Sequence, residues 1–213
     1  MPSPPTTALP DRRGRKNAAT REAIIDAAEE LLRSGGPSAV TLPTIAERAD
    51  VALQTIYNRV GSRDAVLLAV AERAFAANRI YMDEAYNTGG TPRERILAAG
   101  NAYIRFATER PHEFRLLLDP PELPGPTEAI ADLTDEQNGK LAAALRAGIA
   151  DGSVRPDLNP DQTAKLLWAM LNGVLALTWR TDRTRIDPDD LLAPVADLIA
   201  RGVESRPERH PSN

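Results

Sequence analysis

The sequence predicts an all-α protein, and three observations support this. Alanine and leucine dominate the 213 residues, and aromatic side chains make up only 4% of them. Apolar residues recur three and four positions apart, as in an amphipathic helix, whereas the alternation typical of strands is scarce. Proline and glycine interrupt these periodic segments. We therefore expect about nine helices, divided into a three-helix domain at 17–63 and a larger helical domain at 64–204.

The first domain is expected to contain one helix of medium length and two short ones. The first runs over about 17–33 and ends at a pair of glycines. Thr41 can cap the second helix, which has proline in its first turn. The third helix follows a turn at 50–52 and extends to about Val60. The preceding segment, 1–16, is rich in Pro, Ser and Thr before its cations and is expected to be a disordered basic arm.

The larger domain is expected to begin with a long helix capped by Ser62. The next helix is opened by a capping box of Thr91 and Glu94, with proline at the first helical position. The last two helices are expected at about 160–180 and 188–204, because each begins with a capping residue followed by proline. A short helix, a proline-rich loop, a longer helix and a terminal tail complete the order, at 113–118, 119–126, 127–150 and 205–213.

Composition argues against several classes of protein. The chain has no cysteine, so it cannot form disulfides or thiolate metal sites. It has two histidines, His112 and His210, and no glycine-rich phosphate loop, nucleophile elbow or cluster of metal ligands. We therefore expect no catalytic residues, no cofactor and no metal. No apolar run reaches the roughly 18 residues of a membrane span, and the N-terminus lacks the apolar stretch of a signal peptide, so a cytoplasmic protein is expected.

The charge distribution is compatible with double-stranded DNA as a partner, despite a net charge of −4. Residues 1–65 hold nine Lys/Arg and eight Asp/Glu, so most of the acidity belongs to the remainder. The N-terminal arm could lie along phosphates or in the minor groove, and a solvated tail is the alternative. Its cations are Arg12, Arg13, Arg15 and Lys16.

The second and third helices, with the turn between them, have the proportions of a helix-turn-helix. Over this segment and its flanks, a characteristic set of residues recurs at fixed spacing: Thr41, Ile45, Ala46, Ala49, Val51, Thr55, Tyr57, Arg63 and Asp64. With these residues, the sequence over about 17–70 resembles the DNA-binding domain of the TetR family of bacterial transcription regulators.

Three positions depart from the family pattern. Asp50 stands where the family usually has glycine, and aspartate tolerates the left-handed conformation better than most residues. Ala52 often corresponds to serine, so the third helix lacks its usual cap. Val60 usually corresponds to phenylalanine, so looser packing is expected there.

The resemblance and the helical phase assign DNA contacts as hypotheses. Tyr57 would place its hydroxyl on a phosphate, with a purely structural tyrosine as the alternative. Thr41 and Arg63 lie at helix N-termini, where phosphate contact is favoured; Arg63 as a solvated surface cation is the alternative. Arg59 is expected on the DNA backbone, and Thr44 is included among the contacts. The candidates for base edges, each with water or phosphate as the alternative, are Gln54, Thr55 and Asn58.

The resemblance also implies a homodimer whose last two helices pair with their copies in a four-helix bundle. These helices carry more apolar residues than one exposed helix needs, although an intramolecular core must use some of them. The residues in question are Leu166, Leu167, Met170, Leu171, Val174, Leu175, Leu191, Leu192, Val195, Leu198 and Ile199.

The middle helices would enclose a cavity for a small-molecule effector. The candidate ligand-binding residues are Tyr103, Phe106, Phe114, Trp168 and Asn172. For the aromatic rings the alternative is packing in the core, and for Asn172 it is a backbone group or the partner chain. The C-terminal half resembles a TetR subgroup in which Trp, His and Gly recur at the spacing of Trp168, Asn172 and Gly173, with asparagine here in place of histidine.

Together these features predict a ligand-responsive, DNA-binding transcriptional regulator. The family resemblance implies a repressor that a small molecule releases from a palindromic operator. An activator of the same fold and a DNA-independent helical interaction protein are the alternatives.

Overall fold

The computed structural model describes residues 12–120 and 126–205, and helices account for most of these residues. Within these ranges β structure is limited to one isolated bridge between Val154 and Glu204. The all-α prediction is therefore confirmed. The elements are α1 (Arg12–Gly35), η1 (Pro37–Ala39), α2 (Leu42–Arg48), α3 (Leu53–Arg59), α4 (Arg63–Tyr86), α5 (Pro92–Glu109), α6 (Pro111–Leu118), α7 (Pro126–Ala150), α8 (Pro160–Thr178) and α9 (Pro188–Val203).

Helix starts follow the capping residues that the sequence indicates. The Ser62 side chain accepts a hydrogen bond at the start of α4, and Asn159 does so at the start of α8. Thr91 and Glu94 form the expected capping box of α5. Each side chain satisfies a backbone N–H that has no partner inside the helix, and so fixes where the helix begins.

The beginning of α1 differs from the expectation. A disordered arm was predicted through residue 16, but α1 begins at Arg12, so the basic residues of the arm form its first turns. Arginine, lysine and alanine are good helix formers and no proline interrupts this segment, which explains the extension. Residues 1–11 and 206–213, where an arm and a tail were expected, lie outside the described part.

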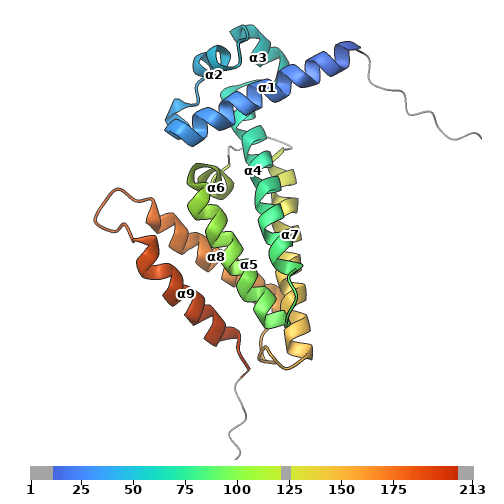
Figure 1. The fold of residues 1–213 in the computed structure, drawn as a ribbon, viewed down its shortest axis with the longest axis vertical. Helices are drawn as coiled ribbons and strands as arrows, with labels where there is room; N and C mark the ends of the chain where they lie inside the picture. Colours follow the sequence, from blue (N-terminus) through green and yellow to red (C-terminus); the bar gives the residue numbers. More distant parts are fainter. Residues whose placement is uncertain (1–11, 121–125, 206–213) are drawn as a thin grey trace, which may run out of the picture.

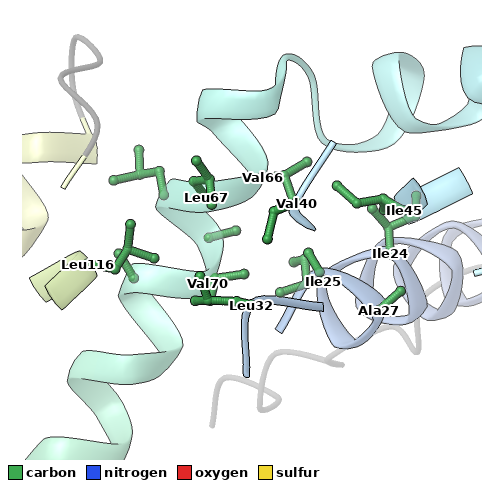
Figure 2. Close-up of a cluster of buried hydrophobic side chains, with 14 of the residues drawn as sticks. Ile24, Ile25, Ala27, Leu32, Val40, Ile45, Val66, Leu67, Val70 and Leu116 are labelled. Carbon is green, nitrogen blue, oxygen red and sulfur yellow. The ribbon is translucent and has the colours of Figure 1, made fainter. Parts of the chain in front are cut away.

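The first three helices share a core with the beginning of α4 (Figure 1, Figure 2). Ile24 of α1, Ile45 of α2, Ile56 of α3 and Val66 of α4 are fully buried in one cluster. Leu116 of α6 belongs to the same cluster and lies near α4 in Figure 2. The hydrophobic core therefore crosses the expected domain boundary between residues 63 and 64.

Ion pairs on α6 join it to α1. Arg110 lies 2.8 Å from Glu29 of α1 and 3.1 Å from Glu113, whose side chain is only 1% exposed. Arg33 of α1 lies 3.6 Å from Glu113 and 3.0 Å from Glu29. Arg73 of α4 approaches Glu29 at 3.4 Å. Because charges removed from water require partners, this cluster constrains the placement of α6 against α1 and α4.

The remaining helices pack below this end of the molecule (Figure 1). Helices α4, α5 and α7 pack against one another, and α8 packs against α7. Helix α9 contacts α5 and α8. In the part of the chain that the structure describes, no helix is long and apolar enough to cross a bilayer.

The packing of α3 predicts that alanine substitutions at a buried and at an exposed residue change the free energy of unfolding by different amounts. Ile56→Ala is expected to lower the free energy of unfolding by about 2–5 kcal/mol, because it empties a fully buried site. Leu53→Ala, at a side chain that is 44% exposed, is expected to lower it by less than about 1 kcal/mol. Urea unfolding followed by circular dichroism at one protein concentration measures both. Equal losses would contradict this packing.

A second prediction concerns the buried carboxylate of Glu113. Arg110→Gln removes its principal partner and is expected to destabilise the fold, at the lower end of about 3–5 kcal/mol because Arg33 stays nearby. Adding Glu113→Gln removes the uncompensated charge and is expected to recover part of the loss. Thermal unfolding of the two variants measures this, and a double variant no more stable than Arg110→Gln would show that Glu113 does not need its partner.

Candidate functional sites: an exposed short helix and a cavity between helices

Helix α3 presents a polar outer surface on a buried support. Gln54, Tyr57, Asn58 and Arg59 are exposed, while Thr55 is half-buried. The Gln54 Nε2 group donates a hydrogen bond to Asn58 Oδ1 at 3.2 Å, which aligns two amides on successive turns. Amide groups held in this way can pair bidentately with the edge of an adenine.

The turn before α3 has the backbone that its sequence requires. Asp50 has a φ of 50°, the left-handed region, and is the only described non-glycine residue there. Ala52 provides no side-chain cap to α3, as its side chain predicts. Val60 is only partly buried. Helix α3 is therefore positioned by the core contact of Ile56 and by the turn, without help from an N-cap.

Thr41, Thr44 and Arg63 are used inside the chain. The Thr41 and Thr44 hydroxyls lie 3.0 Å apart, and Thr44 Oγ1 donates to the Ala39 carbonyl at 2.8 Å. The Arg63 guanidinium donates to the carbonyls of Val40 at 2.6 Å and Pro37 at 2.7 Å. Arg63 is therefore neither a solvated cation nor open on all sides to a phosphate. It ties η1 to the start of α4.

The cations of the expected arm lie on the exposed surface of the first turns of α1. All four side chains are exposed. They are held by a helix rather than by a flexible segment. The basic end of α1 therefore continues the three-helix unit formed by α1, α2 and α3. These residues are Arg12, Arg13, Arg15 and Lys16.

A partly open cavity of about 80 Å³ lies among α4, α5, α6, α7, α8 and α9. Its lining is mainly apolar, with amide and hydroxyl groups between the hydrocarbon side chains. The lining residues are Phe75, Asn78, Met82, Tyr86, Ile96, Ala99, Gly100, Tyr103, Leu117, Leu118, Thr134, Gln137, Asn138, Leu141, Leu167, Trp168, Leu171 and Ile199.

The aromatic residues expected at a ligand divide into two groups. Tyr103 and Trp168 line the cavity. Phe106 and Phe114 do not, because both are fully buried in a cluster of edge-to-face rings, with Phe114 5.1 Å from the Tyr103 ring. Asn172 lies behind the lining, where its Oδ1 accepts a hydrogen bond from the Tyr103 hydroxyl at 2.6 Å. Asn172 therefore orients Tyr103.

The cavity residues of α4 were not among the ligand-binding residues predicted from the sequence. Asn78, Met82 and Tyr86 are spaced four positions apart, so they share one face of the helix. They continue the apolar series Val66–Val70–Ala74, which the sequence shows at the same spacing. The signal was the appearance of a polar residue, Asn78, in the continuation of this series. On α7, no comparable signal distinguishes Gln137 from a surface residue.

Helix α8 has an exposed stripe of apolar and small residues. Leu166, Ala169, Gly173 and Ala176 are exposed and recur at helical spacing. A Cβ added at Gly173 would meet no atom of this chain within 4 Å, so packing inside the chain does not explain this glycine.

The other apolar residues of the last two helices are distributed unevenly. On α9, Leu198 is exposed. The core of the chain takes Leu167, Leu171, Leu175 and Val195. The side chains of Leu191 and Leu192 lie outside the described part.

Two family descriptions match separate parts of this sequence. "Bacterial regulatory proteins, tetR family" matches residues 24–70, and "Tetracyclin repressor-like, C-terminal domain" matches residues 96–201. The first covers the second half of α1, η1, α2, α3 and the first turns of α4, and the second reaches from α5 into α9. Neither match tests the proposed Trp-His-Gly subgroup.

Curated relatives resemble the N-terminal part. The HTH-type transcriptional repressor KstR of Mycolicibacterium smegmatis is 37% identical over 76 residues, which are 36% of this chain and 37% of that protein. KstR of Mycobacterium tuberculosis is 33% identical over 76 residues, 36% of this chain and 34% of that protein. The match therefore spans little more than a third of these relatives.

Solved structures share the whole fold at low identity. A TetR-family regulatory protein from Rhodococcus RHA1 has a TM-score of 0.68 at 19% identity, covering 88% of this chain and 98% of that one. The TetR-family regulator PfmR from Thermus thermophilus has a TM-score of 0.65 at 21% identity, covering 85% and 98%. With both halves matched by descriptions of one family, this chain belongs to the TetR family of bacterial regulatory proteins.

Proposed function

We propose that the protein is a DNA-binding transcriptional regulator of the cytoplasm, a repressor that a small molecule releases from a palindromic operator. The observation that carries the proposal is the surface of α3, where Gln54, Tyr57, Asn58 and Arg59 are exposed above a fully buried Ile56. A short helix with this surface fits the major groove. A purely structural helix would not require four exposed polar side chains on one corner of the molecule.

The exposed residues divide into two proposed roles. Gln54 and Asn58, aligned by their mutual hydrogen bond, read base edges together with Thr55. Tyr57, Arg59 and the basic end of α1 contact phosphates, which contribute affinity without sequence preference. Thr41, Thr44 and Arg63 act mainly by holding η1, α2 and α4 in place, since their polar groups are used within the chain.

We propose a homodimer formed through α8 and α9. The exposed stripe on α8 and the exposed Leu198 on α9 would be covered in a symmetric four-helix contact. Gly173 then has a role, since it lets the partner helix approach closely. Two copies of α3 placed on successive turns of a duplex, roughly 34–36 Å apart, would read a palindrome.

Two helices, α4 and α6, connect the cavity to the three-helix unit. In the proposed mechanism, a bound ligand acts through them to release the protein from DNA. Phe75 and Asn78 of α4 line the cavity, and Val66 of the same helix lies in the core beneath α3. Leu117 of α6 lines the cavity next to Leu116, which packs in that core. A ligand that shifts α4 or α6 therefore changes the spacing of the two α3 helices.

The two roles on α3 predict different consequences for DNA binding. Gln54→Ala is expected to change the sequence obtained when binding sites are selected from random DNA. Arg59→Ala is expected to weaken binding about equally on all sequences and to reduce the slope of log K against log salt by about 1. Arg105→Ala, which removes an exposed cation of α5, is the matched control and should change neither. If the Gln54 variant selects the parent site, this residue does not read bases; if the parent protein selects no site, the DNA-independent interaction protein is the better interpretation.

The proposed dimer contact through α8 and α9 predicts that a charged side chain introduced into it separates the subunits. Leu166→Glu and Leu198→Glu, at side chains 66% and 62% exposed in the single chain, are each expected to give monomers in light scattering and to weaken palindrome binding at least tenfold. Ile80→Glu, on α4 and 60% exposed, is the matched control and should leave the oligomeric state unchanged. A dimer that persists with either glutamate would place the interface elsewhere.

A further inference from the structure

Three side chains that line the cavity carry buried polar atoms without a hydrogen-bond partner. These atoms are Nδ2 of Asn78, the hydroxyl oxygen of Tyr86, and both Nε2 and Oε1 of Gln137. Asn78 is 3% exposed, so water outside the protein does not reach it. The three residues come from α4 and α7, and they stand on the lining of the same cavity among Phe75, Met82 and other hydrocarbon side chains.

Such groups are unfavourable unless something in the cavity pairs with them. A buried donor or acceptor left without a partner destabilises a protein by about 1–3 kcal/mol. Apolar side chains of similar size would fill the same positions without this penalty. Because the unpaired groups lie on a cavity lining rather than inside packed core, water in the cavity or a ligand that displaces it can supply the partners.

Among the described residues that line the cavity, none is ionisable and charged near neutral pH, since Asp, Glu, Lys, Arg and His are all absent from them. Burial raises the pKa of Tyr86 and of Tyr103, so both phenols stay protonated. Lys140 of α7 is one turn from Gln137 but does not line the cavity. Its ammonium group is paired with Asp83 at 2.7 Å and with Glu136 at 2.8 Å. A charged ligand would thus lose its hydration without gaining a counter-ion.

We propose that the effector is an uncharged, largely apolar molecule with a hydroxyl, carbonyl or amide group that pairs with Asn78, Gln137 and Tyr86. The lining offers a defined set of hydrogen-bonding groups to such a ligand. The Asn78 and Gln137 amides offer N–H donors, Gln137 Oε1 offers an acceptor, and the Tyr86 hydroxyl can donate or accept. A hydroxyl or amide on the ligand supplies both an acceptor and a donor. This proposal rests on the proposed function, because it names the ligand class of the regulator's own cavity.

The size of the cavity sets the scale of a suitable probe. Each water needs roughly 10–15 Å³ of such space, so about 80 Å³ holds several non-hydrogen atoms before any side chain moves. 1-Octanol has nine non-hydrogen atoms, slightly more than this space holds, so its binding requires a small shift of flexible lining side chains such as Met82. Three probes with a straight eight-carbon chain and different heads separate charge from hydrophobicity: 1-octanol is neutral, octanoate is an anion and octylammonium is a cation at pH 7.

Binding of the three probes to the full chain tests the proposal. Trp168 lines the cavity, so its fluorescence reports occupancy, with calorimetry as a second measurement. We expect 1-octanol to bind at least tenfold more tightly than octanoate or octylammonium. Equal or tighter binding of either ion, or no binding of 1-octanol up to its solubility, would overturn the proposal.

Variants connect the binding to the named groups. Asn78→Leu and Gln137→Leu are each expected to weaken 1-octanol binding roughly tenfold, about 1.4 kcal/mol, by removing its partners. Neither should lower the melting temperature of the free protein, because each removes an unpaired polar group. Asn101→Leu, at an exposed position of α5, is the matched control. Unchanged affinity in both cavity variants would overturn the assignment. Because none of these measurements uses DNA, they fail independently of the proposed DNA binding.

Discussion

The packing of Val66, Leu67 and Val70 of α4 against the buried side of α1 is the contact on which the rest of the molecule depends (Figure 2). It makes one 24-residue helix a member of both halves of the protein. At a rise of about 1.5 Å per residue, α4 carries a rigid connection over roughly 36 Å. The same helix that closes the core under α3 reaches the cavity with Asn78, so the two sites cannot be treated as separate units.

Helix α6 adds a second connection of a different physical kind. Its Glu113 is almost fully buried and is held by Arg110, which also reaches Glu29 of α1. His112 of the same helix stands against Gly36, where a Cβ would lie 3.2 Å from the ring and where φ is +69°. Both contacts depend on specific geometry, since a buried charge needs its partner and a side chain at Gly36 would crowd the His112 ring. Helix α6 is therefore joined to α1 by ion pairs and by a close backbone approach as well as by hydrocarbon packing.

The order and the bounds of most helices could be predicted from the sequence, because helix ends are determined by local residues. Thr41, Ser62 and Asn159 each satisfy a backbone group one turn away, so a short motif contains the whole cause. The start of α1 was misplaced because no comparable signal marks it. There the boundary depends on helix propensity alone, and propensity changes gradually along the chain.

The candidate sites were harder to predict because they depend on distant parts of the chain. Arg63 matched a family position, but its partners are carbonyls 23 and 26 residues earlier, which no local pattern encodes. Phe106 and Phe114 are aromatic residues of the kind that often line ligand pockets. Here, however, they pack against the rings of Tyr81, Tyr103 and Trp179. Conversely, Gln137 reads as a surface residue of α7 until the fold places it on the cavity.

The magnitudes indicate how the cavity could control DNA binding. Moving a two-state equilibrium from 1:99 to 99:1 requires a difference in ligand affinity between the states of about 5.5 kcal/mol. Four unpaired polar atoms supply this difference when each contributes about 1.4 kcal/mol, which lies within the range of about 1–3 kcal/mol for a buried unpaired group, and when only one arrangement of α4 and α7 lets the ligand reach them all. Hydrocarbon contacts are non-directional, so they depend less on the orientation of the ligand than hydrogen bonds do. The polar groups on α4 and α7 would then set which state the ligand selects, and the apolar lining would set how tightly it binds.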